Sequence, residues 1–81
     1  MGHGDFAIVS RRHGGEVVAE GGSLEEALAR FNGHDPGRDI GFVVVEYHKY
    51  REIPLFECSS AEETRRKIRA KIGEARGRQL R

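Results

Sequence analysis

The fold is decided by an apolar stretch that occurs twice, first as FAIV at residues 6–9 and again as FVVV at residues 42–45. Runs rich in β-branched and aromatic residues, bounded by turn signals, are typical of β-strands. In both halves the run is followed by an acidic and β-branched pair, and later by a serine and two glutamates, after a slip of one residue. We therefore expect two half-domains, residues 5–33 and 40–73, with the same order of elements.

Each half begins with a predicted β-hairpin. In the first hairpin the strands flank the segment His-Gly-Gly at 13–15, where glycine readily adopts the positive φ of a tight turn. In the second hairpin, residues 40–48 and 52–58 flank a turn region at 47–51. Because proline cannot donate to a strand ladder, Pro54 indicates that the last strand lies at a sheet edge or carries a bulge.

Each half ends with a predicted helix. Ser23 and Glu26 form the capping-box pattern before a short helix over residues 24–32. Ser59 or Ser60 begins the second helix, and the glycines at 73 and 77 weaken its far end. We therefore expect that helix to end near residue 73, and we expect flexible ends at 1–4 and 74–81.

The order of elements is thus ββαββα, which predicts one α+β domain over residues 1–81. Alternating directions allow the two most apolar strands to pair antiparallel at the centre. This gives a four-stranded antiparallel sheet of order 2-1-3-4, with both helices on one face and a pseudo-twofold axis between the halves. The same pattern is also compatible with a homodimer in which a second copy completes the fold.

The composition is that of a globular protein, with 37% hydrophobic and 33% charged residues. No apolar run approaches the roughly 20 residues of a membrane span, and the N-terminal residues lack the pattern of a secretory signal. A single cysteine, Cys58, excludes an internal disulfide and fits a reducing compartment. We expect a cytoplasmic protein without membrane contact.

The small net charge of +1 conceals an asymmetry along the chain. Residues 1–60 contain six Lys and Arg but ten Asp and Glu, a net charge of −4, whereas residues 61–81 contain eight Lys and Arg and three Glu, a net charge of +5. A basic end on an acidic body favours an acidic partner surface or nucleic acid. A solvated helix face and tail is the alternative explanation.

The residues that could support catalysis do not form a recognisable motif. Cys58 and the four histidines are scattered without the spacing of a metal site or a nucleophile. The paired glutamates at 25–26 and 62–63 fall in the first turns of helices, where capping and the helix dipole account for them. We expect no enzymatic activity, no cofactor and no metal.

Two segments remain as candidate contact surfaces. The turn of the second hairpin interleaves aromatic and cationic side chains, and Tyr and Arg are enriched at interface hot spots. The second helix carries a basic face that could contact phosphates or a protein. The candidate partner-binding residues are Tyr47, His48, Lys49, Tyr50 and Arg51 on the turn, and Arg65, Arg66 and Arg69 on the helix.

A short α/β chain with charged patches and no catalytic apparatus is similar in character to phage anti-CRISPR proteins, with residues 47–51 and the basic helix 65–71 as the features that carry the resemblance. The resemblance implies an inhibitor that contacts a protein partner such as a CRISPR effector complex, and blocks DNA access or recruitment. A small DNA- or RNA-binding domain acting through the basic helix is the alternative function.

Overall fold

The computed structural model describes residues 5–12, 15–33 and 41–79, and their order is the predicted ββαββα. The elements are β1 (Phe6–Ser10), β2 (Glu16–Gly21), α1 (Leu24–Asn32), β3 (Phe42–His48), β4 (Arg51–Cys58) and α2 (Ala61–Gln79). His13, the loop at 34–39 and the flexible end expected at 1–4 lie outside the described residues.

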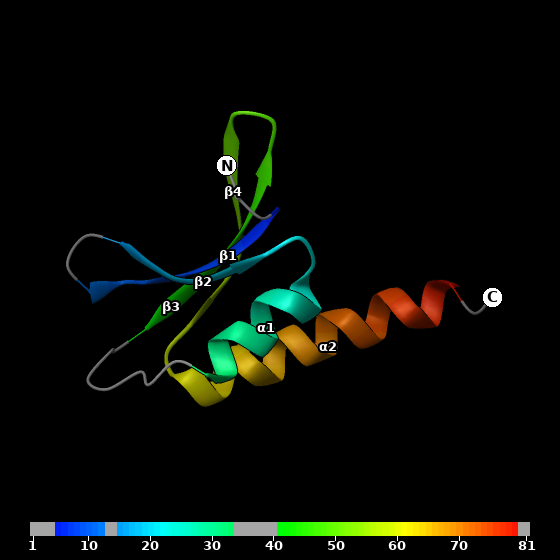
Figure 1. Cartoon of the computed structure of the whole chain (residues 1–81). Coiled ribbons are helices and arrows are strands. Elements are labelled where there is room, and N and C mark those ends of the chain that lie inside the picture. The colour runs from blue at the N-terminus through cyan, green and yellow to red at the C-terminus, as the bar shows by residue number, and fades with distance from the viewer. Residues whose placement is uncertain (1–4, 13–14, 34–40, 80–81) are drawn as a thin grey trace.

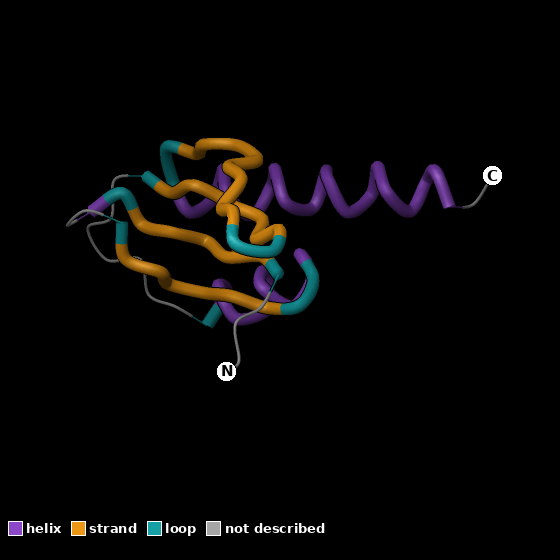
Figure 2. Tube along the Cα trace, turned by 90° about the horizontal axis from the view of Figure 1, so that it is seen from above, coloured by secondary structure: helices purple, strands orange, loops and turns teal. Residues whose placement is uncertain are grey.

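The four strands form one antiparallel sheet of order β2-β1-β3-β4, which confirms the predicted topology. Both helices cover the same face of this sheet (Figures 1 and 2). Because β1 and β3 run antiparallel at the centre, the two hairpins point away from each other, and the β3–β4 hairpin projects beyond the helices (Figure 1). Its turn is therefore separated from the body of the protein.

The two halves are related by a pseudo-twofold axis through the β1–β3 pair. At one end of the pair, the backbone N–H of Arg11 donates to the carbonyl of Gly41 at 3.0 Å. At the other end, the equivalent N–H of Tyr47 donates to the carbonyl of Asp5 at 2.7 Å. The same bond thus closes both ends of the central ladder, as an internal repeat requires.

Both outer strands carry a bulge at the equivalent place. The register of β1 with β2 shifts between Ile8 and Val9, which leaves Val18 without a directly opposed residue. The register of β3 with β4 shifts between Val44 and Val45, which leaves Leu55 in the same position beside Pro54. Pro54 therefore lies in an edge strand next to a bulge, as its missing N–H donor requires.

Each helix begins with the same capping geometry. In α1, the amide of Glu26 donates to Ser23 Oγ at 3.1 Å, and the Glu26 carboxylate accepts from the amide of Gly22 at 2.6 Å. In α2, the corresponding bonds join Glu63 to Ser60 at 3.1 Å and to the amide of Ser59 at 2.6 Å. Ser60 is thus the N-cap of α2, and both acidic pairs lie in first turns.

The core lies between the sheet and the helices. Its largest fully buried side chains include Phe31 from α1, Phe42 and Val44 from β3, Ile8 from β1 and Ile68 from α2. The rings of Phe31 and Phe42 pack edge to face, with centroids 5.1 Å apart. Every element thus contributes to one small core, which leaves functional contacts to the surface.

Helix α2 is longer than the sequence pattern indicates, since it continues past residue 73 to Gln79. Glycine lowers helix propensity by about 1 kcal/mol but keeps its N–H donor, so Gly73 weakens the helix without ending it. The C-terminal part of α2 extends beyond α1 and the sheet (Figure 2). In the described part of the chain, no helix combines the length and the apolar character needed to cross a membrane.

Candidate partner-binding surface

The hairpin tip is defined here as residues 47–52, all of which are exposed except the half-buried Tyr47. His48 pairs with Arg51 across the hairpin, so the turn itself consists of Lys49 and Tyr50. The Tyr50 side chain is fully exposed, with a relative accessible area of 104%. A large aromatic group held in water at the end of a projecting hairpin is available for contact, because none of the described residues packs against it.

The cations of the tip are also exposed. Lys49 and Arg51 make no ion pair with any residue that the structure describes. Together with Tyr47, Tyr50 and Glu52 they line a shallow hollow of about 350 Å³. The tip therefore presents two cationic groups, two tyrosine rings and one carboxylate around a small concave surface.

Carboxylates surround the base of the tip. Tyr47 is directly opposite Glu52 in the β3–β4 ladder and is hydrogen-bonded to the carbonyl of Asp5. Partial burial, the negative charges of Glu52 and Glu20 and a hydrogen bond with Glu52 raise the pKa of Tyr47. Tyr47 thus remains a neutral phenol near physiological pH and lies among acidic groups, whereas the cations lie farther out along the hairpin.

The basic helix contributes its residues unequally. Arg65 lies with its guanidinium carbon 5.6 Å from the centroid of the Phe31 ring, and its Nε donates to Asn32 Oδ1 at 2.9 Å. These contacts tie α2 to the C-terminal end of α1. Arg65 therefore has a structural role in the fold, in addition to any contact with a partner.

Two further cations of α2 are held by Glu63. Lys67 lies 3.6 Å from the Glu63 carboxylate, and its Nζ donates to the carbonyl of Glu57 at 2.9 Å. Arg66 is more exposed and lies 3.9 Å from the same carboxylate. The contact of Lys67 repeats that of Arg30, which donates to the carbonyl of Glu20 at 2.9 Å. This lysine therefore belongs to the repeat rather than to a separate basic patch.

Arg69 remains available on the helix surface. It makes no ion pair with any described residue, and it lines an open groove of about 430 Å³ between α1 and α2. Leu28 and Ile72 supply the apolar part of this groove, and Glu25 lines it as well. The groove thus carries both signs of charge.

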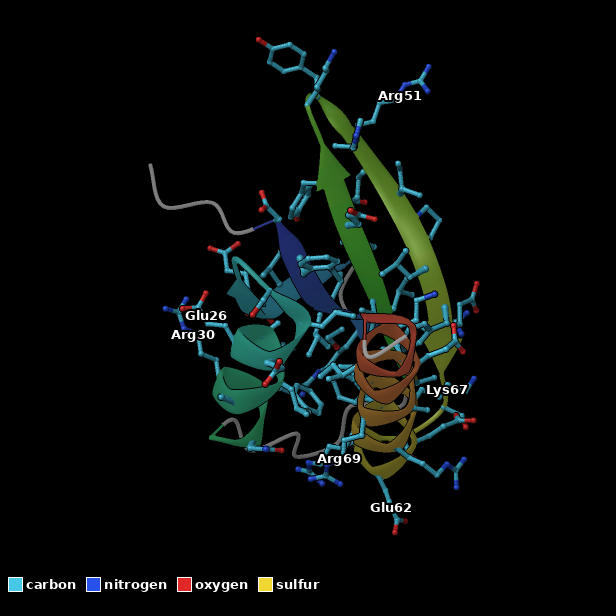
Figure 3. The ribbon with its side chains drawn as sticks, turned by 90° about the vertical axis from the view of Figure 1, so that its right-hand side faces the viewer. Glu26, Arg30, Arg51, Glu62, Lys67 and Arg69 are labelled. Carbon is cyan, nitrogen blue, oxygen red and sulfur yellow. The ribbon has the colours of Figure 1, made fainter. Side chains whose placement is uncertain are left out.

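The structure does not bring the two predicted segments together. Arg51 lies at the end of the projecting hairpin, whereas Arg69 lies on the helix side at the opposite end of the molecule (Figure 3). Helix α2 begins after β4 has returned from the tip, so its first turns lie far from Tyr50. A partner would meet either the hairpin tip or the helix face first, and each surface must be tested by itself.

Sequence reasoning missed a contact that crosses the sheet. Arg11 lies 3.3 Å from the carboxylate of Glu57 on the far edge strand, and its side chain passes over Gly41. A Cβ on Gly41 would lie 3.0 Å from Arg11 Cδ and 3.1 Å from the carbonyl oxygen of Cys58. The glycine that directly precedes β3 was the available signal, because close approach of another group often requires glycine.

The chemically reactive residues are not assembled into a site within the described chain. Cys58 is buried, with 2% of its surface exposed, and burial raises the pKa of its thiol. His48 is the only histidine among the described residues, and it lies on the hairpin tip. No group of three or more potential metal-ligating side chains occurs in the part of the chain that the structure describes.

Comparisons with known proteins add no constraint on these surfaces. No family model, no curated protein and no solved structure matches this chain. The functional argument therefore depends on the geometry and charge of the hairpin tip and of the basic helix.

Proposed function

We propose that this chain is a small non-enzymatic binding protein that contacts its partner through the hairpin tip. The observation that carries the proposal is the full exposure of Tyr50 on a hairpin that projects beyond the helices. Ordering an exposed tyrosine costs little side-chain entropy, and burying it in a partner removes a large apolar area from water. A projecting hairpin with such a residue can enter a concave surface that a flat face cannot reach.

The kind of partner that we propose is a larger complex that handles nucleic acid. Such complexes expose large protein surfaces beside the channels that bind nucleic acid. The two tip cations, which make no ion pair with a described residue, suit an acidic part of such a protein surface. Binding at such a place would inhibit the complex by blocking DNA access or recruitment of a further component. The similarity in character to anti-CRISPR proteins favours a CRISPR effector complex in the cytoplasm as the target.

The proposal is tested by co-purification with a matched pair of variants. Tagged wild-type protein, Tyr50→Ala and Val17→Ala are used as bait in host lysate, and the captured proteins are identified by mass spectrometry. Val17 is the control because it is also exposed, at 45%, but lies on the other hairpin. We expect the wild type and Val17→Ala to capture the same partner, and Tyr50→Ala to lose it; equal capture by all three would refute the proposal.

Inhibition is tested separately with purified CRISPR effector complexes. DNA binding and cleavage by a panel of these complexes are measured with and without an excess of the protein. A CRISPR effector complex is supported as the target if the wild-type protein abolishes DNA binding or cleavage by one complex and the Tyr50→Ala variant does not. Unchanged activity throughout the panel would refute this target and leave the binding role to be judged from the co-purification.

A second candidate function is nucleic-acid binding by α2. It is favoured by the exposure of Arg69 and Lys71, neither of which makes an ion pair with a described residue, and by the extension of α2 beyond the body (Figure 2). Phosphate contacts weaken steeply with salt, so gel shifts are run at about 50 and 200 mM salt. Binding of DNA or RNA by the wild type that is lost in the double variant Arg69→Gln/Lys71→Gln would support this second function. Absence of a gel shift with the wild type at the lower salt concentration would exclude it.

A further inference from the structure

The turn of the β3–β4 hairpin has an unfavourable backbone conformation for the residue that occupies it. Lys49 has a φ of 60°, and it is the only described residue other than glycine with a positive φ. Tyr50, the second residue of the turn, does not share this sign. A two-residue hairpin turn with positive φ at its first position only is the type II′ pattern, in which that position is normally glycine.

The chain uses glycine for the same purpose elsewhere. The described positive-φ position in the first hairpin is Gly15, with a φ of 101°. A residue with a Cβ is sterically disfavoured at a positive φ, and such strain persists only where the surrounding structure holds it. No described ion pair engages the Lys49 side chain, so no electrostatic contact of that side chain within the described chain offsets this cost.

We propose that Lys49 occupies this strained position because its ammonium group contacts an acidic surface of a folded protein partner, beside the site that receives Tyr50. This inference rests on the proposed function of the hairpin tip and adds the chemistry of the partner. Lys49 directly precedes Tyr50 in the turn, and both residues line the hollow of the tip. Arg51, also unpaired within the described chain, reinforces the positive end of the tip.

The carboxylates at the base of the tip favour a protein over a nucleic acid. Asp5 and Glu52 adjoin Tyr47, Glu20 acts on its pKa, and Glu46 lies one position before it on β3. A polynucleotide is negatively charged along its whole length, so a strand that reached the tip cations would also approach these carboxylates. A cluster of carboxylates on a protein surface is confined to one place, so it can contact the tip cations without approaching the carboxylates at the base of the tip.

The first test separates the strain of Lys49 from its charge. Lys49→Gly and Lys49→Asn both remove the ammonium and both suit a positive φ, whereas Lys49→Glu reverses the charge. We expect the first two variants to unfold at the same or a higher urea concentration than the wild type. A clear decrease in their stability would show that the lysine supports the fold, and would overturn the inference.

The second test measures binding with defined probes at low salt. Amide chemical shifts of the protein are followed by NMR during titration with poly-L-glutamate and, separately, with a single-stranded DNA of similar charge. We expect poly-L-glutamate to shift residues 48–51, and Lys49→Gly to weaken this binding about 2–5-fold, as loss of an exposed ion pair of about 0.5–1 kcal/mol implies. Stronger shifts of the tip with DNA, or equal affinity of the variant, would overturn the inference.

The failure of this inference can be told apart from that of the proposed function. If Tyr50→Ala loses the captured partner while Lys49→Gly and Lys49→Glu retain it, the tip is still the contact surface, but its partner is not acidic. If Lys49→Glu loses the partner and Lys49→Gly weakens it, both proposals are supported. If none of these variants changes capture, both are refuted.

Discussion

The clearest test of how the basic helix is used is the replacement of Arg65 by alanine. The guanidinium group lies 5.6 Å from the centroid of Phe31 and donates to Asn32 at 2.9 Å. A cation–π contact near the surface contributes about 0.5–1 kcal/mol, and a net hydrogen bond contributes about 1 kcal/mol. Alanine regains a few tenths of a kcal/mol through its helix propensity, so we expect Arg65→Ala to lower the free energy of unfolding by roughly 1–2 kcal/mol.

The measurement is urea unfolding followed by far-UV circular dichroism, with Arg69→Ala as the matched control. Arg69 lies on the same helix but makes no ion pair with a described residue, so the same change in composition removes no described interaction there. In a domain of this size, each kcal/mol lowers the melting temperature by about 4–8 °C. We expect a clear decrease for Arg65→Ala and little change for Arg69→Ala.

The result that would refute this reasoning is equal stability of the two variants.

If Arg65→Ala does lower the stability, a double-mutant cycle with Asn32→Ala separates the two contacts of Arg65. If the hydrogen bond contributes, the coupling free energy between Arg65 and Asn32 is positive and close to about 1 kcal/mol. A coupling near zero would leave the cation–π contact with Phe31 as the only stabilising interaction of Arg65.

Three further predictions concern the caps, the pH dependence and the buried thiol. We expect Ser23→Ala and Ser60→Ala to cost about 1 kcal/mol each and to be additive in urea unfolding, because both hydroxyls accept at 3.1 Å; a cost at only one helix would contradict the equivalence of the caps. The bonds from Ser59 and the charge of Lys67 lower the pKa of Glu63 to about 2 from its ordinary value of 4.5. Its stabilising effect is therefore complete above pH 4.5 and is lost as the pH falls toward 2, so the stability of Glu63→Gln should depend less on pH in this window than that of the wild type. Cys58 should react slowly with a thiol reagent at pH 8 in the native state and rapidly in urea, because burial raises its pKa; fast native reaction would contradict its position in the core.

The parts of the fold that could be predicted depend on local rules. Pro54 indicated an edge strand or a bulge, and both are present, because a missing N–H donor limits where a strand residue can lie. Ser23 and Glu26 indicated the start of α1, because capping involves residues close together in the sequence. The choice between Ser59 and Ser60 stayed open, since either hydroxyl could cap the helix until the register of β4 placed Ser60 at its start.

The second half has one residue more than the first, and the hairpins show where this residue lies. The first hairpin closes after Ser10 and Glu16, whereas the second continues through the pairs of Tyr47 with Glu52 and His48 with Arg51. The extra residue of the second half therefore lies in the turn region of its hairpin. The sequence pattern placed the slip later, because it matched Glu16 and Val17 with Glu52 and Ile53, whereas the register makes Ile53 the equivalent of Glu16.

The parts of the site that could not be predicted depend on contacts between distant residues. The spacing of cations along α2 does not show that Arg65 lies over Phe31, since the two are brought together by packing of the helices. The composition of the turn likewise does not show that Lys49 has a positive φ, because lysine is not a usual residue there. In both cases tertiary structure determines which of several similar cations is available.

The most direct test of the central claim is site-specific photo-crosslinking in living cells. A photoreactive phenylalanine analogue replaces Tyr50 in one strain, Val17 in a second and Arg69 in a third, and crosslinked products are identified by mass spectrometry. Contact through the hairpin tip predicts one dominant protein adduct from position 50 and none of that product from positions 17 or 69. An adduct from position 69 with no product at position 50 would contradict it.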